Sequence, residues 1–201
     1  QIYVNDVFHV ASALGLHECI FVGTSLGGLL TMAMATVVPT LVHSAILNDI
    51  GPELNPDAIG NIINYAGDNT GYHSVDDVMT HMKVKFSDEM PFTTEDWHRH
   101  IQKTFKLENG MYKPNWDTKL ADVFKQPQPQ TDLWAFFKSL GARKTLVLRG
   151  ELSKLFAKDT YKKMLDVLPN ITGIEVPNIG HAPRLTEDVS ITAISDFLER
   201  K

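Results

Sequence analysis

A serine flanked by glycines follows a short apolar run near the start of the chain. Residues 23–28 read Gly-Thr-Ser-Leu-Gly-Gly, between the apolar runs 19–22 and 29–35. A Gly-x-Ser-x-Gly pattern between a strand and a helix is typical of a sharp, strained turn that exposes a nucleophilic hydroxyl. We therefore predict that Ser25 is a nucleophile and that the N–H of Leu26, at a helix N-terminus, helps to stabilise an oxyanion.

The glycines around this serine have a steric explanation. Because the chain turns from strand to helix within about one residue, side chains two positions before and two positions after the serine must be minimal. Gly23 and Gly27 meet that demand, and we expect Gly28 to leave room for the helix to pack against the strand. The pattern lacks the Gly-x-Gly-x-x-Gly and Gly-Lys-Ser/Thr signatures of phosphate-binding loops.

A nucleophilic serine needs a base, and a loop near the C-terminus offers one. His181 lies in the tetrapeptide Gly-His-Ala-Pro at 180–183, after a short strand pattern and before an amphipathic helix. In proteins with this serine turn, the histidine comes late in the chain, after the serine and the acid. We therefore predict His181 as the general base.

Four stretches together resemble the α/β-hydrolase superfamily, specifically its capped esterase and C–C hydrolase members. They are residues 22–28, Leu-Asn-Asp-Ile-Gly-Pro at 47–52, Leu-Val-Leu-Arg-Gly-Glu-Leu-Ser at 146–153, and 180–183, in the order of the family. The resemblance implies an α/β fold with a mostly parallel sheet, helices on both faces, and a helical cap inserted between strands six and seven. It implies no metal and no organic cofactor.

The resemblance also implies structure ahead of the first residue. The family carries about four strands and a His-Gly loop before the serine turn, and that loop donates the second oxyanion N–H. This sequence begins at Gln1, in a segment that we expect to be a helix over 3–14. We therefore expect an N-terminally truncated member, a fragment of a longer protein with the first strands and the second oxyanion donor missing.

The acidic member of the triad departs from the family pattern. It follows strand seven in a Gly-Glu-Leu-Ser-Asp motif, and the matching position here is Lys154. Two positive charges about 4 Å apart at an effective dielectric near 20 repel by roughly 4 kcal/mol, so an ammonium cannot replace the acid. Asp49, at the end of strand six, is a possible substitute acid, or it orders the turn at 51–52. Glu151 is a weaker substitute, or a solvated loop carboxylate.

Three functions remain open on this pattern. The first is a serine hydrolase that cleaves a small, apolar carboxylic ester or lactone through an acyl-enzyme. The second is a C–C bond hydrolase of a ring-cleavage product, which would use the same Ser25 and His181. The third is an inactive truncated relative or a non-enzymatic binding module, because Lys154 occupies the acid position.

The middle of the chain differs from both ends. Strand and helix patterns alternate over 1–52 and 143–201, as in a parallel sheet covered on both faces. Residues 53–142 contain no convincing strand pattern and indicate helices, the last over 132–140 after a stiff Pro/Gln linker at 126–130. We predict a hydrolase core from the two ends and a helical cap or lid from 53–142.

Apolar side chains of this predicted cap favour an apolar substrate over a sugar or a nucleotide. They include Met79, Met82, Trp134 and Phe137, none of which we assign individually to the site. A metal site at the His-x-His of 98–100 is not expected, since residues two apart lie on different faces of a helix.

Composition bounds the partners. The 201 residues carry a net charge of −5, which argues against nucleic acid as a partner. No run approaches the roughly 18 apolar residues of a membrane span, and the single cysteine, Cys19, excludes a disulfide within the chain. We expect a small-molecule ester or lactone as the partner and a cytoplasmic location by default; the oligomeric state stays open.

Overall fold

Alternating strands and helices at the two ends of the chain build one parallel sheet. The computed structural model describes residues 2–86, 88–125 and 131–199. It divides the chain into a sheet unit, Gln1–Asn55 with Thr131–Lys201, and an inserted unit, Pro56–Gln130. The predicted linker at 126–130 lies outside the described residues.

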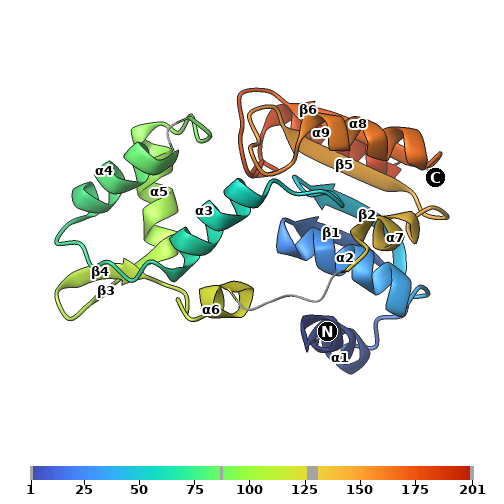
Figure 1. The fold of residues 1–201 in the computed structure, drawn as a ribbon, viewed down its shortest axis with the longest axis horizontal. Helices are drawn as coiled ribbons and strands as arrows, with labels where there is room; N and C mark the ends of the chain where they lie inside the picture. Colours follow the sequence, from blue (N-terminus) through green and yellow to red (C-terminus); the bar gives the residue numbers. More distant parts are fainter. Residues whose placement is uncertain (1, 87, 126–130, 200–201) are drawn as a thin grey trace. The chain divides into compact units, whose positions relative to one another are not determined.

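The sheet has four parallel strands in the order β1-β2-β5-β6 (Figure 1). They are β1 (Cys19–Thr24), β2 (Val42–Asn48), β5 (Thr145–Gly150) and β6 (Ile171–Val176). Every residue of β5 and all but one of β2 are buried, as expected for the central strands of a parallel sheet. Because the strands are parallel, the residues that follow β1, β2, β5 and β6 all lie at the same end of the strands, the carboxyl end.

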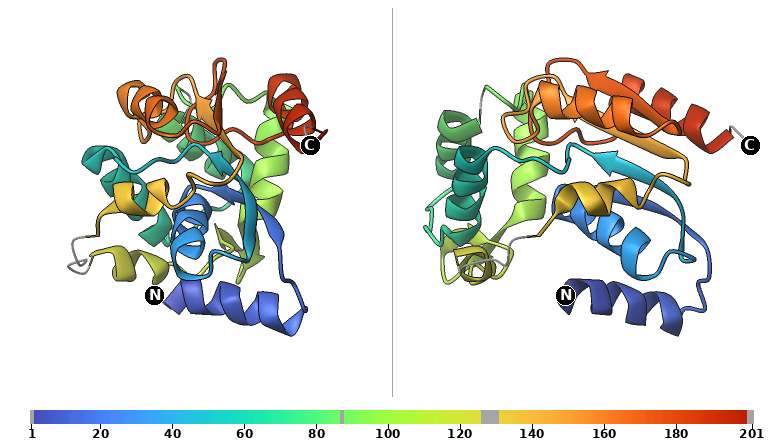
Figure 2. Two further views of the ribbon diagram at one scale, coloured as in Figure 1. Left: turned by 90° about the vertical axis from the view of Figure 1, so that its right-hand side faces the viewer. Right: turned by 45° about the vertical axis from the view of Figure 1, so that its right-hand side comes forward.

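Helices cover both faces of this sheet. They are α1 (Ile2–Ala13), α2 (Leu26–Val37), α7 (Leu133–Lys138), α8 (Lys158–Val167) and α9 (Asp188–Glu199). Figure 2 shows α2 and α8 on one face and α9 on the other. Right-handed crossovers from β1 to β2 and from β5 to β6 place α2 and α8 on the same face. The face under α9 is apolar, with Ile46, Leu146 and Val176 buried against Phe197 and its neighbours. The predicted α/β fold with a mainly parallel sheet is confirmed.

The inserted unit has its own apolar core. Its elements are α3 (Pro56–Gly67), α4 (Val75–Phe86), α5 (Thr94–Thr104), β3 (Phe105–Glu108), β4 (Met111–Pro114) and α6 (Leu120–Lys125). Val78, Met79 and Met82 of α4 pack with Trp97 and Ile101 of α5 in one buried cluster. Because the two methionines fill this core, they give no support to an apolar substrate.

Two expectations for the middle section were wrong. A hairpin, β3 with β4, stands where we predicted no strand, and its two-residue turn is Asn109-Gly110 with φ angles of 51° and 78°. An Asn-Gly pair between short strands is a strong hairpin signal. Residues 131–142 belong to the sheet unit, because α7 packs against α2 and buries Phe137 completely.

In the part of the chain that the structure describes, every helix is too short or too polar to cross a membrane.

Candidate active site

Ser25 lies in a strained turn between β1 and α2. Its backbone has φ 50° and ψ −117°, a region that costs a residue with a side chain about 1–3 kcal/mol. The N–H of Ser25 donates to the carbonyl of Asn48 at 3.1 Å, and its own carbonyl accepts from Gly28 at 2.9 Å. These bonds fix the hydroxyl at the carboxyl edge of the sheet, in the sharp turn that the sequence pattern predicts.

The steric demand of this turn falls on Gly23 and Gly28. A Cβ on Gly23 would lie 2.5 Å from the carbonyl carbon of Gly27, and a Cβ on Gly28 would collide with the side chain of Ile50. A Cβ on Gly27 would meet no other atom of the described chain within 4 Å, apart from its own turn of helix and its chain neighbours. Our expectation that Gly27 must lack a side chain is therefore wrong.

His181 contacts both other members of a candidate triad. Its Nε2 lies 3.0 Å from Ser25 Oγ, and its Nδ1 lies 2.8 Å from Asp49 Oδ2. Because a carboxylate only accepts, Nδ1 carries the proton that it donates to Asp49, and Nε2 accepts from the Ser25 hydroxyl. This is the tautomer that a general base needs toward serine.

Asp49 is fully buried directly after β2, with φ 51°. Besides His181, two groups donate to its carboxylate: the Gly150 N–H to Oδ1 at 2.8 Å and the Ser153 hydroxyl to Oδ2 at 2.6 Å. A buried carboxylate is costly without such donors. The carboxylate thus bonds to the imidazole and to the loop after β5, and these three partners all lie outside the turn at 51–52.

The other two positions considered for the acid lie at the surface. Lys154 is exposed, one residue after the buried Ser153. Glu151 is also exposed, and its Oε2 accepts from the N–H of Asn178 at 2.9 Å. The loop that carries the acid in the family pattern therefore supplies donors to Asp49 here.

A buried arginine holds this loop. Arg149 donates to the carbonyl of Phe156 at 2.8 Å, to the carbonyl of Glu151 at 3.2 Å and to the carboxylate of Glu175 at 2.9 Å. Lys158 also donates to Glu175, and this hydrogen bond is the main reason why the pKa of Glu175 lies below its ordinary value. The arginine charge contributes to the same shift. The donors to Asp49 therefore lie on a loop tied down by charged hydrogen bonds.

Leu26 is the first residue of α2. The first four N–H groups of a helix have no acceptor within the helix, and the helix dipole favours negative charge there. Its N–H follows Ser25 directly, so this placement suits a donor to an oxyanion formed at the serine.

Two residues of the site were missed by sequence reasoning. Asn48 and Ser153 lie in the family-like stretches 47–52 and 146–153, yet we predicted no role for either. A serine one position before the unexpected Lys154 was an available signal for a compensating donor. The contacts of Asn48 join segments far apart in the chain, and no local pattern reports them.

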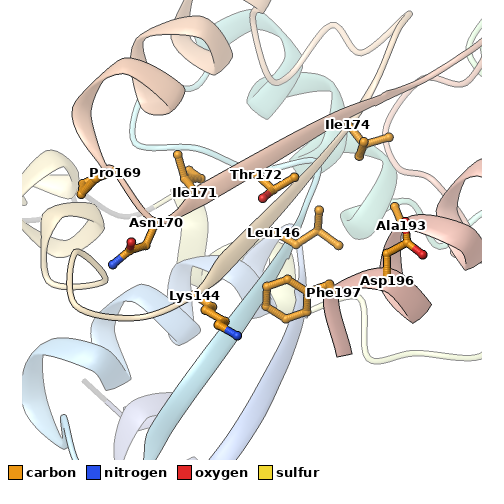
Figure 3. Close-up of a pocket in the computed structure, with 10 residues that line it drawn as sticks. All are labelled: Lys144, Leu146, Pro169, Asn170, Ile171, Thr172, Ile174, Ala193, Asp196 and Phe197. Carbon is orange, nitrogen blue, oxygen red and sulfur yellow. The ribbon is translucent and has the colours of Figure 1, made fainter. Parts of the chain in front are cut away.

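A cavity of about 240 Å³ lies at the opposite end of the sheet (Figure 3). Its lining residues come from the amino ends of β5 and β6 and from α9: Lys144, Leu146, Pro169, Asn170, Ile171, Thr172, Ile174, Ala193, Asp196 and Phe197. Since Ser25 and Asp49 follow the carboxyl ends of their strands, this cavity is not part of the candidate active site. Among the described residues, no group of three or more His, Cys, Asp or Glu side chains could hold a metal ion.

Comparison with known proteins gives one family. The model of the family described as alpha/beta hydrolase fold matches residues 3–188. The crystal structure of an alpha/beta hydrolase from Novosphingobium aromaticivorans is similar, with a TM-score of 0.92 and 34% identity over 99% of this chain and 71% of that one.

Two curated relatives are more distant. A 3-hydroxybutyrate-oligomer hydrolase from Cupriavidus necator is 27% identical, over 97% of this chain and 70% of the relative. A 2-(acetamidomethylene)succinate hydrolase from Mesorhizobium japonicum is 23% identical, over 98% of this chain and 70% of the relative.

Proposed function

The chain belongs to the alpha/beta hydrolase fold family, and from that premise we propose that it is a serine hydrolase that cleaves a small carboxylic ester or lactone through an acyl-enzyme. One observation carries the proposal. A continuous line of hydrogen bonds runs from Ser25 Oγ through the His181 imidazole to Asp49, with separations of 3.0 Å and 2.8 Å. A nucleophile, a base within hydrogen-bond reach and an orienting acid are the parts that acyl transfer requires.

Acylation follows from this geometry. Ser25 Oγ attacks the carbonyl carbon of the ester while its proton passes to His181 Nε2. Asp49 stabilises the imidazolium that forms, and the Leu26 N–H donates to the oxyanion. When the tetrahedral intermediate collapses, the bond to the alcohol oxygen breaks and that oxygen takes the proton from Nε2.

Deacylation repeats the steps with water. Nε2 accepts a proton from the water that attacks the acyl carbon, and the bond to Ser25 Oγ then breaks. Nε2 returns the proton to Ser25, and the carboxylic acid product leaves.

The position of Asp49 supports an enzyme over a non-enzymatic binding module. The inactive alternative depended on a lysine at the acid position, which would leave the imidazole without a carboxylate. Asp49 supplies that carboxylate from β2 at 2.8 Å. The two curated relatives described above are both named as hydrolases, and the substrates in their names are in keeping with a small substrate here.

A fluorophosphonate probe tests the proposal, because it labels only an activated serine. We expect labelling of Ser25, identified by peptide mass spectrometry, and its loss in Ser25→Ala. His181→Ala should slow labelling by at least about 10³-fold, whereas His17→Ala, at an exposed histidine of the same unit, should label as the unmodified protein does. Absent labelling, or labelling of another serine in a folded sample, would refute the proposal.

A further inference from the structure

One buried amide contacts the segments of all three proposed triad members. Asn48 is the last residue of β2 and is fully buried, directly before Asp49. Its Nδ2 donates to Thr24 Oγ1 at 3.0 Å and to the carbonyl of Pro183 at 2.8 Å. The backbone carbonyl of Asn48 accepts from the N–H of Ser25 at 3.1 Å. We infer that Asn48 is a positioning residue that sets the separation between Ser25 and His181.

The chemistry of the partners fixes the orientation of the amide. A proline carbonyl can only accept, so the amide nitrogen of Asn48, not its oxygen, faces Pro183. The same nitrogen donates its second N–H to the Thr24 hydroxyl oxygen. A side chain with two protons on one nitrogen is therefore needed to bond both segments at once, and an aliphatic side chain of similar size can bond neither.

The sheet alone does not join the two segments. Ser25 follows β1 and His181 follows β6, and these strands are the two edges of the sheet. The loop of His181 is tied on its upstream side by the bond from Leu152 N to the Ile179 carbonyl at 2.9 Å. On its downstream side, Asn48 supplies the bond to Pro183.

The expected role is in the chemical step. The inference rests on the proposed function, because it concerns the geometry between nucleophile and base. A displacement of about 1 Å in such a pair can lower a rate roughly 10²-fold. Since Asn48 is completely buried, its loss should lower kcat and leave KM nearly unchanged.

The test compares Asn48→Leu with Asn170→Leu. The first removes both side-chain bonds without adding charge. The second changes an exposed asparagine of the same unit at the far end of the strands, whose Nδ2 lies 3.4 Å from the Gly141 carbonyl. Using p-nitrophenyl acetate, we expect kcat of Asn48→Leu to fall about 10²-fold with KM within about threefold, and Asn170→Leu to match the unmodified protein. An unchanged kcat, or a loss confined to KM, would overturn the inference.

Two further measurements keep the inference testable. If Asn48→Leu does not fold, Thr24→Val is tested instead. It removes one of the two acceptors of Asn48 Nδ2, the hydroxyl at the exposed end of β1, and kcat should fall about threefold to tenfold. An unchanged kcat would overturn the inference.

A crystal structure of Asn48→Leu, or of Thr24→Val where that variant replaces it, gives a readout independent of activity. The distance from Ser25 Oγ to His181 Nε2 should lengthen from 3.0 Å beyond hydrogen-bond range. An unchanged distance would overturn the inference even where the unmodified protein fails to label and the proposed function itself has failed.

Discussion

The imidazole of His181 meets a carboxylate from β2, although the family pattern places the acid after β5. The two strands are neighbours in the sheet, and the N–H of Asp49 donates to the Leu148 carbonyl at 2.7 Å. Parallel neighbours lie about 5 Å apart, so residues that follow either strand can reach the same imidazole. Asp49 follows β2 and reaches the imidazole, while Gly150 and Ser153 donate to its carboxylate. With the carboxylate supplied from β2, an exposed lysine can stand at position 154.

A matched pair of substitutions at these two positions tests the exchange. Asp49→Asn should lower kcat for p-nitrophenyl acetate by about 10³- to 10⁴-fold, because an amide no longer holds the proton on His181 Nδ1 and favours the wrong tautomer. Lys154→Ala should leave kcat/KM within about twofold, as for most exposed substitutions. Steady-state kinetics at one pH give both values, with circular dichroism to confirm folding. Little effect of Asp49→Asn on kcat would refute the assignment of Asp49 as the orienting acid.

At the scale of elements, the strand-turn-helix around Ser25 could be predicted because its demands are local. A buried strand, small neighbours and an apolar helix stand next to one another in the sequence. The Asn109-Gly110 pair is an equally local signal for the hairpin, but our prediction for this segment used helical periodicity and missed it. The donors to Asp49 could not be predicted in the same way, since Ser153 lies 104 positions from its acceptor. Likewise, α7 joins the sheet unit through packing on α2, which no pattern within 131–142 reports.

The two glycines of the serine turn should respond differently to alanine. Gly23→Ala places a Cβ against the backbone of Gly27, which cannot move without opening the turn, and we expect it to lower the free energy of unfolding by at least about 3 kcal/mol. Gly27→Ala faces open space in α2 and should stay within about 1 kcal/mol of the unmodified protein, since alanine favours helix. Urea unfolding followed by circular dichroism measures both. Similar losses at the two positions would mean that Gly27 has a steric role after all.

At the scale of the whole molecule, each of the two units contains a buried apolar cluster of its own among the described residues. One lies in the sheet unit, under α9, and includes Ile46 and Leu148. The other lies in the inserted unit between α4 and α5 and includes Trp97, which is 2% exposed. A unit with its own core can open as a cooperative unit of its own. The three residues of the proposed triad, Ser25, Asp49 and His181, all belong to the sheet unit.

Amide hydrogen exchange of two core variants tests this division. Trp97→Ala removes the largest side chain of the inserted core and should cost about 3–5 kcal/mol there, so protection should fall in α4 and α5 while β2 and β5 keep theirs. Ile46→Ala is the mirror variant, and it should lower protection in β2 and β5 by about 2–5 kcal/mol while leaving α4 and α5 unchanged. Parallel losses in both regions from either variant would show one cooperative unit. Separate losses would mean that the inserted unit can open without unfolding the segments that carry Ser25, Asp49 and His181.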